Sequence, residues 1–157
     1  MKSGIHLVML GVLLAALLTG CGGNKSTDPS RAGRLENGDR QLSDGSYVDI
    51  YMCRATANGN ASIDMSSPSL ECLIAVVRVN SDNTATAVAS SNTAGPAVTA
   101  SWEAVKGQTY AVGVSGLHQQ AGDYTLTFHD LDSITTRAAA PDTSRNEFDA
   151  LAGMLKR

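Results

Sequence analysis

The stretch "AVTASWEAVKGQTYAVGVSGLHQQAGDYTLTFHD", residues 97–130, decides the fold class of this chain. Apolar and polar residues alternate within it over three short segments: 97–105, 109–116 and 123–130. In the last segment Tyr124, Leu126 and Phe128 fall on one face, which is the period-two pattern of a half-buried strand. The breaks "KGQ" and "LHQQAG" carry turn residues and leave no room for a helix. Three consecutive strands are therefore predicted.

The same pattern extends toward the N-terminus. Four more strands are predicted: 47–53, 61–65, 72–79 and 85–90. The segment "CLIAVVRV" is apolar on both faces through Val77, so it should be a central strand or one covered on both sides. Evenly spaced short strands without intervening helices predict an all-β fold, an antiparallel β-sandwich.

Composition narrows the classes of function. The 157 residues suit one main domain, and 12 basic against 15 acidic residues give a net charge of −3. No basic block is present, which argues against a nucleic-acid partner. Aromatic residues are few, with one Trp, four Tyr and two Phe, and most fall on predicted core faces.

The order of residues resembles the bacterial pre-peptidase C-terminal domain over roughly residues 38–129. The stretches "DGSYVDIYMC", "ASWEAVKGQTYAVGVSG" and "AGDYTLTF" carry the likeness. The matching positions are Asp49, Tyr51, Trp102, Tyr110, Val114, Ser115, Gly116, Gly122, Tyr124 and Leu126. The resemblance implies a β-sandwich with jelly-roll topology, here placed at 38–131. The family usually follows secreted proteases, where it is implicated in substrate binding or secretion. No peptidase precedes the domain in this sequence, so proteolysis is not expected to transfer.

The N-terminus indicates export. Lys2 and the amino terminus supply positive charge, and an apolar run of 12 residues follows from Leu7 to Leu18. As a helix this run would span roughly 18 Å, short of the ~30 Å hydrocarbon core. We therefore predict a cleavable signal helix at 1–20. Residues Leu18-Thr19-Gly20-Cys21 resemble the lipobox of bacterial lipoproteins, which implies that the Cys21 thiol carries a diacylglycerol and the new amino group a fatty acid such as palmitate.

Two acyl chains would attach the chain stably to a membrane of the cell envelope. Gly22 stands where an aspartate retains lipoproteins at the inner membrane, so the outer membrane is favoured. Residues 21–37 are polar and rich in Gly, Ser and Pro, and are predicted to form a flexible tether beyond the lipidated cysteine.

Two cysteines remain besides Cys21. Cys53 stands where the family usually has Phe, and Cys72 opens a following strand. In an oxidising envelope an even pair favours a disulfide, and the alternative is two buried free thiols.

The last segment, 132–157, is predicted to be a linker and an amphipathic helix. Ser144 and Glu147 have capping-box spacing. Four apolar residues then share one helical face: Phe148, Leu151, Ala152 and Leu155. This face either packs on the sandwich or binds a partner through Phe148, Leu151 and Leu155.

Candidate catalytic groups are sparse. Ser115, His118 and Asp123 lie close in sequence, but "GVSGL" lacks the strand-to-helix context of a nucleophile elbow. His118 and His129, together with Asp130 and Asp132, have no zinc-ligand spacing. A non-enzyme is therefore predicted, with no cofactor required.

One cluster of carboxylates lies at the entry to the predicted sandwich and extends into its first predicted strand. Its members are Glu36, Asp39, Asp44 and Asp49. Oxygen ligands suit calcium, and the resemblance implies a calcium site near this edge in some members. A solvated acidic surface is the favoured interpretation, with calcium as the alternative.

These observations favour a lipid-anchored envelope domain that binds a protein or polysaccharide or supports an envelope assembly. The alternative is a carbohydrate-binding module, which would need exposed aromatic side chains. A third hypothesis is an accessory domain of a secreted peptidase system.

Overall fold

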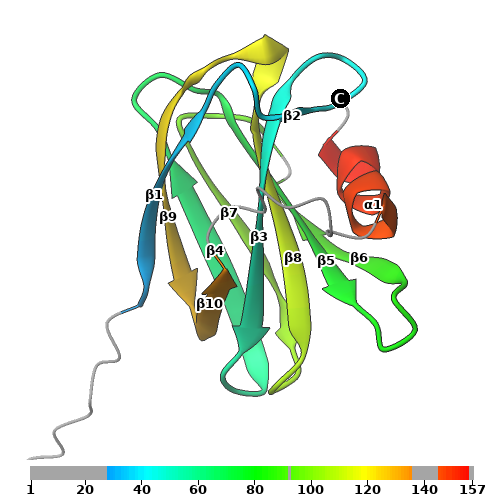
Figure 1. Cartoon of the computed structure of the whole chain (residues 1–157). Coiled ribbons are helices and arrows are strands. Elements are labelled where there is room, and N and C mark those ends of the chain that lie inside the picture. The colour runs from blue at the N-terminus through cyan, green and yellow to red at the C-terminus, as the bar shows by residue number, and fades with distance from the viewer. Residues whose placement is uncertain (1–27, 92, 136–144, 156–157) are drawn as a thin grey trace, which may run out of the picture.

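The computed structural model describes residues 28–91, 93–135 and 145–155. The predicted signal helix and Cys21 lie outside these residues, as does Ser144 of the predicted capping box. The described part forms two facing β-sheets with one helix packed on the outside (Figure 1).

All neighbouring strands in the two sheets are antiparallel. The first sheet has, in order, β1 (Ser30–Leu35), β9 (Gly122–His129), β4 (Gly59–Ser66) and β7 (Ala97–Ala104). The second sheet has, in order, β10 (Leu131–Thr135), β3 (Tyr47–Ala55), β8 (Thr109–Gly116), β5 (Cys72–Val79) and β6 (Ala85–Ser90). The short strand β2 (Arg40–Gln41) pairs with β3 beside this order. A 3-10 turn (Leu117–Gln119) and helix α1 (Arg145–Leu155) complete the chain. The predicted antiparallel β-sandwich with a C-terminal helix is confirmed.

The main core lies between the two sheets. The predicted face of β9 is fully buried there through Tyr124, Leu126 and Phe128. Trp102 of β7 and Tyr110 of β8 meet from opposite sheets, with ring centroids 5.2 Å apart. Burying such large apolar side chains is worth about 1.5–3 kcal/mol each, so this layer is the principal source of stability.

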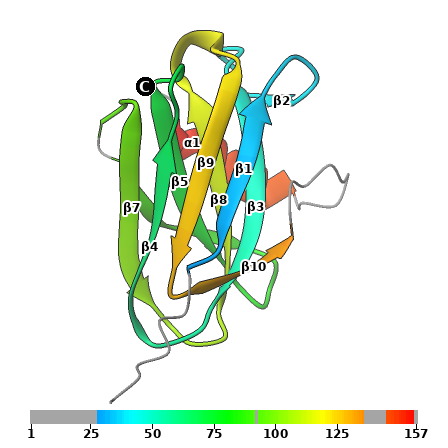
Figure 2. The same ribbon diagram turned by 90° about the vertical axis from the view of Figure 1, so that its left-hand side faces the viewer.

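A second core lies on the outer face of the second sheet. Helix α1 packs there; in Figure 2 the first sheet faces the viewer, and α1 lies behind both sheets. Leu151 and Leu155 of the helix are buried against the outward-facing side chains of the strands, which are Val48, Ile50, Leu73, Ala75, Val77 and Ala111. Strand β5 is therefore buried on both sides through Val77, as its sequence predicts.

Gly113 of β8 lies directly beneath the helix. A Cβ atom at this position would come within 3.2 Å of a Leu155 methyl and 3.4 Å of the Leu151 side chain. A bare backbone position in the centre of the strand thus allows α1 to approach the sheet closely.

Three strands lie outside the predicted ranges, namely the two-residue β2 and two longer strands. Residues 30–35 were expected to belong to the tether of 21–37, but they form β1, which pairs with β9 from Ser30 opposite Thr127 to Leu35 opposite Gly122. Residues 131–135, at the boundary between the predicted sandwich of 38–131 and the predicted linker of 132–157, form β10. Each is an edge strand of its sheet. In β1 only Leu35 is buried, so the alternation that reveals a strand is missing.

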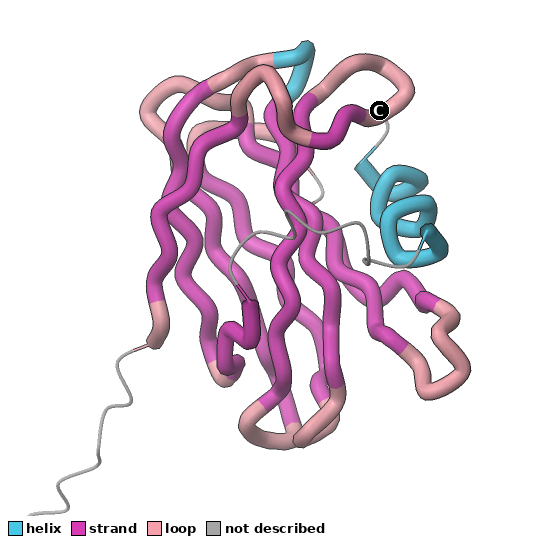
Figure 3. Tube along the Cα trace, viewed as in Figure 1, coloured by secondary structure: helices cyan, strands magenta, loops and turns pink. Residues whose placement is uncertain are grey.

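The sandwich has two different ends (Figures 1 and 3). The end where β1 begins, here called the tether end, carries the connections 56–58, 80–84 and 105–108. The end where β1 finishes, here called the distal end, carries the connections 36–46, 67–71 and 117–121.

Candidate functional site

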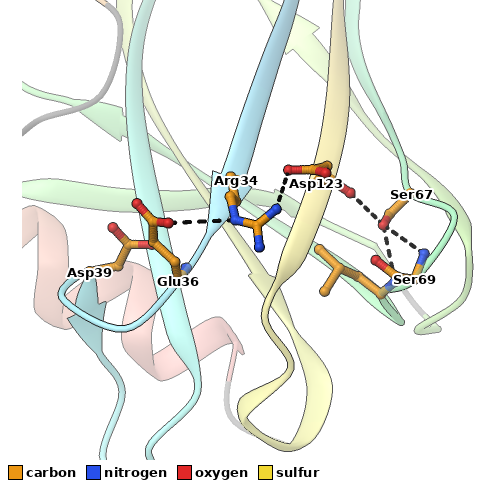
Figure 4. A network of polar contacts seen from close by, with 7 residues as sticks. Arg34, Glu36, Asp39, Ser67, Ser69 and Asp123 are labelled. Carbon is orange, nitrogen blue, oxygen red and sulfur yellow. Dashed lines mark hydrogen bonds and ion pairs between the residues drawn. The ribbon is translucent and has the colours of Figure 1, made fainter.

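An ion-pair network organises the distal end (Figure 4). The Arg34 guanidinium at the end of β1 lies 2.9 Å from the Asp123 carboxylate and 3.5 Å from that of Glu36. Asp39 accepts a hydrogen bond of 2.7 Å from the Glu36 backbone N–H, which shapes the turn after β1. The Arg34 pairs are exposed, so they contribute at most about 1 kcal/mol each and mainly fix the positions of the charges.

Ser67 connects this network to the next loop. Its hydroxyl donates to the Asp123 carbonyl at 2.6 Å and accepts the backbone N–H groups of Ser69 and Leu70 at 3.1 and 3.0 Å (Figure 4). The Ser67 side chain is almost fully buried. One hydroxyl therefore holds the 67–70 turn against the beginning of β9, and the distal end is preorganised.

The structure does not bring the four predicted calcium ligands together. Glu36 and Asp39 belong to the distal network, whereas Asp44 accepts the Ser46 N–H at 2.9 Å. Asp49 is buried between the sheets, where its exposed fraction is 4%. Within residues 28–91, 93–135 and 145–155, no three His, Cys, Asp or Glu side chains are placed to hold a metal ion.

Asp49 belongs instead to a hydrogen-bond chain that crosses the interior. The Tyr124 hydroxyl donates to Asp49 at 2.6 Å and lies 2.6 Å from the Tyr51 hydroxyl. Burial raises the pKa of the Asp49 carboxyl, and the hydrogen bond from Tyr124 partly opposes that rise. Burial also raises the pKa of both tyrosines. These three are among the positions that carry the family resemblance, and their hydrogen bonds join β3 to β9.

A second polar cluster lies on the outer face of the first sheet, at the tether end. The His129 ring has Nδ1 2.6 Å from the Asp28 carboxylate and Nε2 2.8 Å from the Asp64 carboxylate. The other oxygen of Asp64 accepts the Thr99 hydroxyl at 2.6 Å. The hydrogen bond to Asp64 raises the pKa of His129, burial opposes this rise, and the contact with Asp28 adds to it. No sequence spacing indicated this cluster, because its members come from four separate segments.

The residues considered for catalysis have other partners. The Ser115 hydroxyl is fully buried and donates to the Tyr47 carbonyl at 2.7 Å. Asp123 is paired with Arg34, and His118 lies in the 3-10 turn with a φ of 55°. The structure thus gives Ser115, His118 and Asp123 no hydrogen bonds of a triad.

The predicted disulfide between Cys53 and Cys72 is wrong. Both cysteines are free and buried. They lie in β3 and β5, which flank β8 on opposite sides, and they face Tyr110 and Gly116 of that strand, respectively. The six-residue offset along β8 corresponds to about 20 Å, whereas bridged cysteines have Cα atoms within about 7 Å. Burial raises the pKa of Cys53 to about 12 and that of Cys72 to about 11.

The aromatic residues are directed inward. Five of the seven are buried: Tyr51, Trp102, Tyr110, Tyr124 and Phe128. The other two, Tyr47 and Phe148, are partly buried and pack against the two cores. All seven lie within the described residues, so the predicted aromatic core faces are confirmed and no aromatic platform lies on the surface of this part of the chain.

The helix residues considered for partner binding contact the chain's own sandwich. Leu151 and Leu155 are 1% and 3% exposed, and Phe148 packs beside them under Arg40, whose guanidinium lies 5.2 Å from the ring centre. The structure therefore favours the first of the two predicted alternatives, in which the helix completes the domain.

Among the residues that the structure describes, no helix has the length and apolar character needed to cross a bilayer. Cys21 is outside this part of the chain.

Comparison with known proteins supports the fold. No protein-family profile matches the chain, and no curated protein matches it. Among solved structures, the chain is similar to the pre-peptidase C-terminal domain of a collagenase from Bacillus anthracis. The identity is 17%, the match covers 64% of this chain and 88% of that one, and the TM-score is 0.50. A mitogen from Yersinia pseudotuberculosis matches with 10% identity, coverage of 69% and 96%, and a TM-score of 0.47.

The class defined by the fold is therefore a β-sandwich domain. Within this class, the chain's fold is similar to that of a pre-peptidase C-terminal domain, as the sequence resemblance implied.

Proposed function

We propose that this chain is a lipid-anchored protein of the bacterial cell envelope whose β-sandwich binds a macromolecular partner, or supports an envelope assembly, without catalysis. The lipobox at Leu18–Cys21 supports the anchor, and Gly22 supports sorting to the outer membrane. The network of Figure 4 supports a preformed binding end, because its charges are held by short contacts before any partner arrives.

The observation that carries this proposal is the position of β1. β1 begins at Ser30, and Asp28 just before it contacts His129 of the sandwich. Only seven residue steps separate Cys21 from Asp28. Fully extended, they reach at most about 25 Å. A lipid on Cys21 would therefore keep the tether end near the membrane surface and direct the distal end away from it.

The distal end is then the surface that meets a partner. Its exposed charges are mostly acidic, with Glu36, Asp44, Glu71 and Asp123 accompanied by Arg34. A partner that offers cationic or hydroxyl groups would complement this surface, whereas a nucleic acid would be repelled. An envelope protein is the partner that we favour.

A carbohydrate-binding module is less well supported. Such modules stack sugars on exposed aromatic rings, and the aromatic rings here are buried or partly buried in the cores. Polysaccharide recognition would have to rely on hydrogen bonds from the distal loops alone. An accessory role beside a secreted peptidase is supported only by the structural neighbour.

Two experiments test the proposal. Replacing Cys21 with Ala should abolish labelling by a fatty-acid probe and leave an unprocessed precursor, and a normally cleaved soluble product would contradict the lipid anchor. A photo-crosslinking residue at Glu36 should then capture an envelope protein, whereas the same residue at Asn58 of the tether end should not. Equal capture from both positions would contradict binding through the distal end.

A further inference from the structure

The position of His129 between two carboxylates requires a particular protonation state. Both ring nitrogens lie within 2.8 Å of a carboxylate oxygen, Nδ1 on Asp28 and Nε2 on Asp64. An ionised carboxylate only accepts hydrogen bonds, and a neutral imidazole has a single N–H donor. Only the imidazolium, with two N–H groups, can satisfy both contacts at once. In the neutral ring one nitrogen lone pair would face a carboxylate.

The two carboxylates belong to different parts of the molecule. Asp64 is held in the middle of the first sheet, because it lies in β4 and accepts the Thr99 hydroxyl from β7. Although burial acts to raise the pKa of Asp64, the hydrogen bonds from Thr99 and His129 lower it, so this carboxylate stays ionised. Asp28 precedes β1 and is the first residue that the structure describes. Asp28 therefore connects the segment leading into the sandwich to a fixed ionic centre.

Besides the backbone pairing of β1 with β9, two hydrogen bonds hold the beginning of β1. The Phe128 N–H donates to the Pro29 carbonyl at 3.0 Å, and the Ser30 hydroxyl donates to the Leu126 carbonyl at 3.1 Å. Residues 28–32 are mostly exposed, and no apolar side chain among them is buried. The contact between His129 and Asp28 adds an ion pair to the interactions that hold the beginning of β1 against β9.

We propose that His129 is a proton-operated latch that fastens the segment entering β1 to the first sheet and releases it when the ring loses its proton. The groups that face the ring are Asp28 from before β1, Asp64 from β4 and, through Asp64, Thr99 from β7. With the proton present, the imidazolium bridges both carboxylates. On deprotonation the ring keeps one hydrogen bond, and the exposed Asp28 is the partner that can move away.

The direction of the pH effect follows from the raised pKa of His129. A group that binds its proton more tightly in the folded state contributes its full stabilisation below its ordinary pKa, which is 6.5 for histidine. This stabilisation of the folded state is lost as pH rises through the pKa that His129 has in the folded protein. The latch is therefore closed in mildly acidic surroundings and opens toward alkaline pH. If Cys21 is lipidated, opening would lengthen the free chain between the membrane and the sandwich, but the latch itself does not depend on the lipid.

The test uses the full chain in detergent and two NMR measurements. Titration of the imidazole signals should give His129 a pKa above 6.5, and Asp28→Asn should shift that pKa downward. Hydrogen exchange at the Phe128 amide, corrected for its intrinsic dependence on pH, should lose protection as His129 deprotonates. His129→Arg keeps a positive charge at every pH and should keep that amide protected throughout.

The matched control is Arg34→Gln, which breaks the ion pair at the other end of the same β1–β9 pair. It should leave the pH dependence of Phe128 exchange unchanged. A His129 pKa at or below 6.5 would overturn the latch. So would a raised pKa accompanied by Phe128 protection that does not change through the titration, because His129 would then be a static ion pair.

Discussion

The docking of α1 can be tested by removing one side chain, with the substitution Leu151→Ala. Leu151 is 1% exposed and packs over Gly113, which has no side chain able to move into the space left behind. Leu-to-Ala replacements at buried sites cost about 2–5 kcal/mol, and the cost rises with the cavity that remains. We expect the free energy of unfolding to fall by about 3 kcal/mol, because alanine's better helix propensity offsets only a few tenths of a kcal/mol.

Thermal and denaturant unfolding measure this loss. At about 4 °C per kcal/mol for a domain of this size, the unfolding midpoint should fall by about 12 °C. Asp149→Ala is the matched control, since Asp149 is exposed on the same helix and should change stability by no more than about 0.5 kcal/mol. Hydrogen exchange of the α1 amides should also accelerate in Leu151→Ala, because weaker docking leaves a short helix marginal in water.

Equal midpoints for Leu151→Ala and Asp149→Ala would refute this reasoning. The second core would then contribute nothing to stability, and the helix would be free to bind a partner. A large loss with unchanged exchange at α1 would show instead that the α1 amides exchange through local openings that do not depend on the Leu151 contact.

Other substitutions and reagents probe the contact between Tyr124 and Asp49, the two cysteines and strand β1. Tyr124→Phe should lower the free energy of unfolding, measured with denaturant, by about 1–3 kcal/mol, because the Asp49 carboxyl and the Tyr51 hydroxyl lose the group that they share. Tyr51→Phe removes only the end of this chain of hydrogen bonds and should cost less. Cys53 and Cys72 should react with an alkylating reagent only after denaturation and without prior reduction, and a linked peptide in mass spectrometry would contradict their placement. Gly33→Ala should loosen β1, seen as faster exchange at the Tyr124 amide opposite it, because the added Cβ would overlap the Tyr124 ring; unchanged exchange would show that the ring can move aside.

The strands with a strong apolar pattern between turn residues were predictable, and the edge strands β1 and β10 were not. The ranges 72–79, 85–90 and 109–116 agree with β5, β6 and β8 to the residue. Each of these either buries a continuous apolar run or lies between clear turn residues. β1 buries a single side chain, so its pairing depends on the backbone of β9 and leaves no pattern in its own sequence.

The polar sites divide in the same way. Asp49, Tyr51 and Tyr124 could be singled out from the family resemblance, although their hydrogen bonds could not. The cluster of Asp28, Asp64 and His129 carries no motif, because residues 101 positions apart meet only through strand pairing. The disulfide prediction was wrong for a related reason. The number of cysteines says nothing about register, and the register of β3 and β5 on β8 decides the distance between them.

By itself the sequence determined the class of fold, the inward faces of the main strands, the amphipathic face of α1 and the lipobox that motivates the proposed anchor. These are local properties, since the period of apolar residues and the order of short motifs depend only on neighbours along the chain. Which strands form the edges, where the helix docks and which charges meet were decided by the tertiary structure. They depend on strand order and register, which bring together distant residues such as Asp28 and His129 and keep Cys53 away from Cys72.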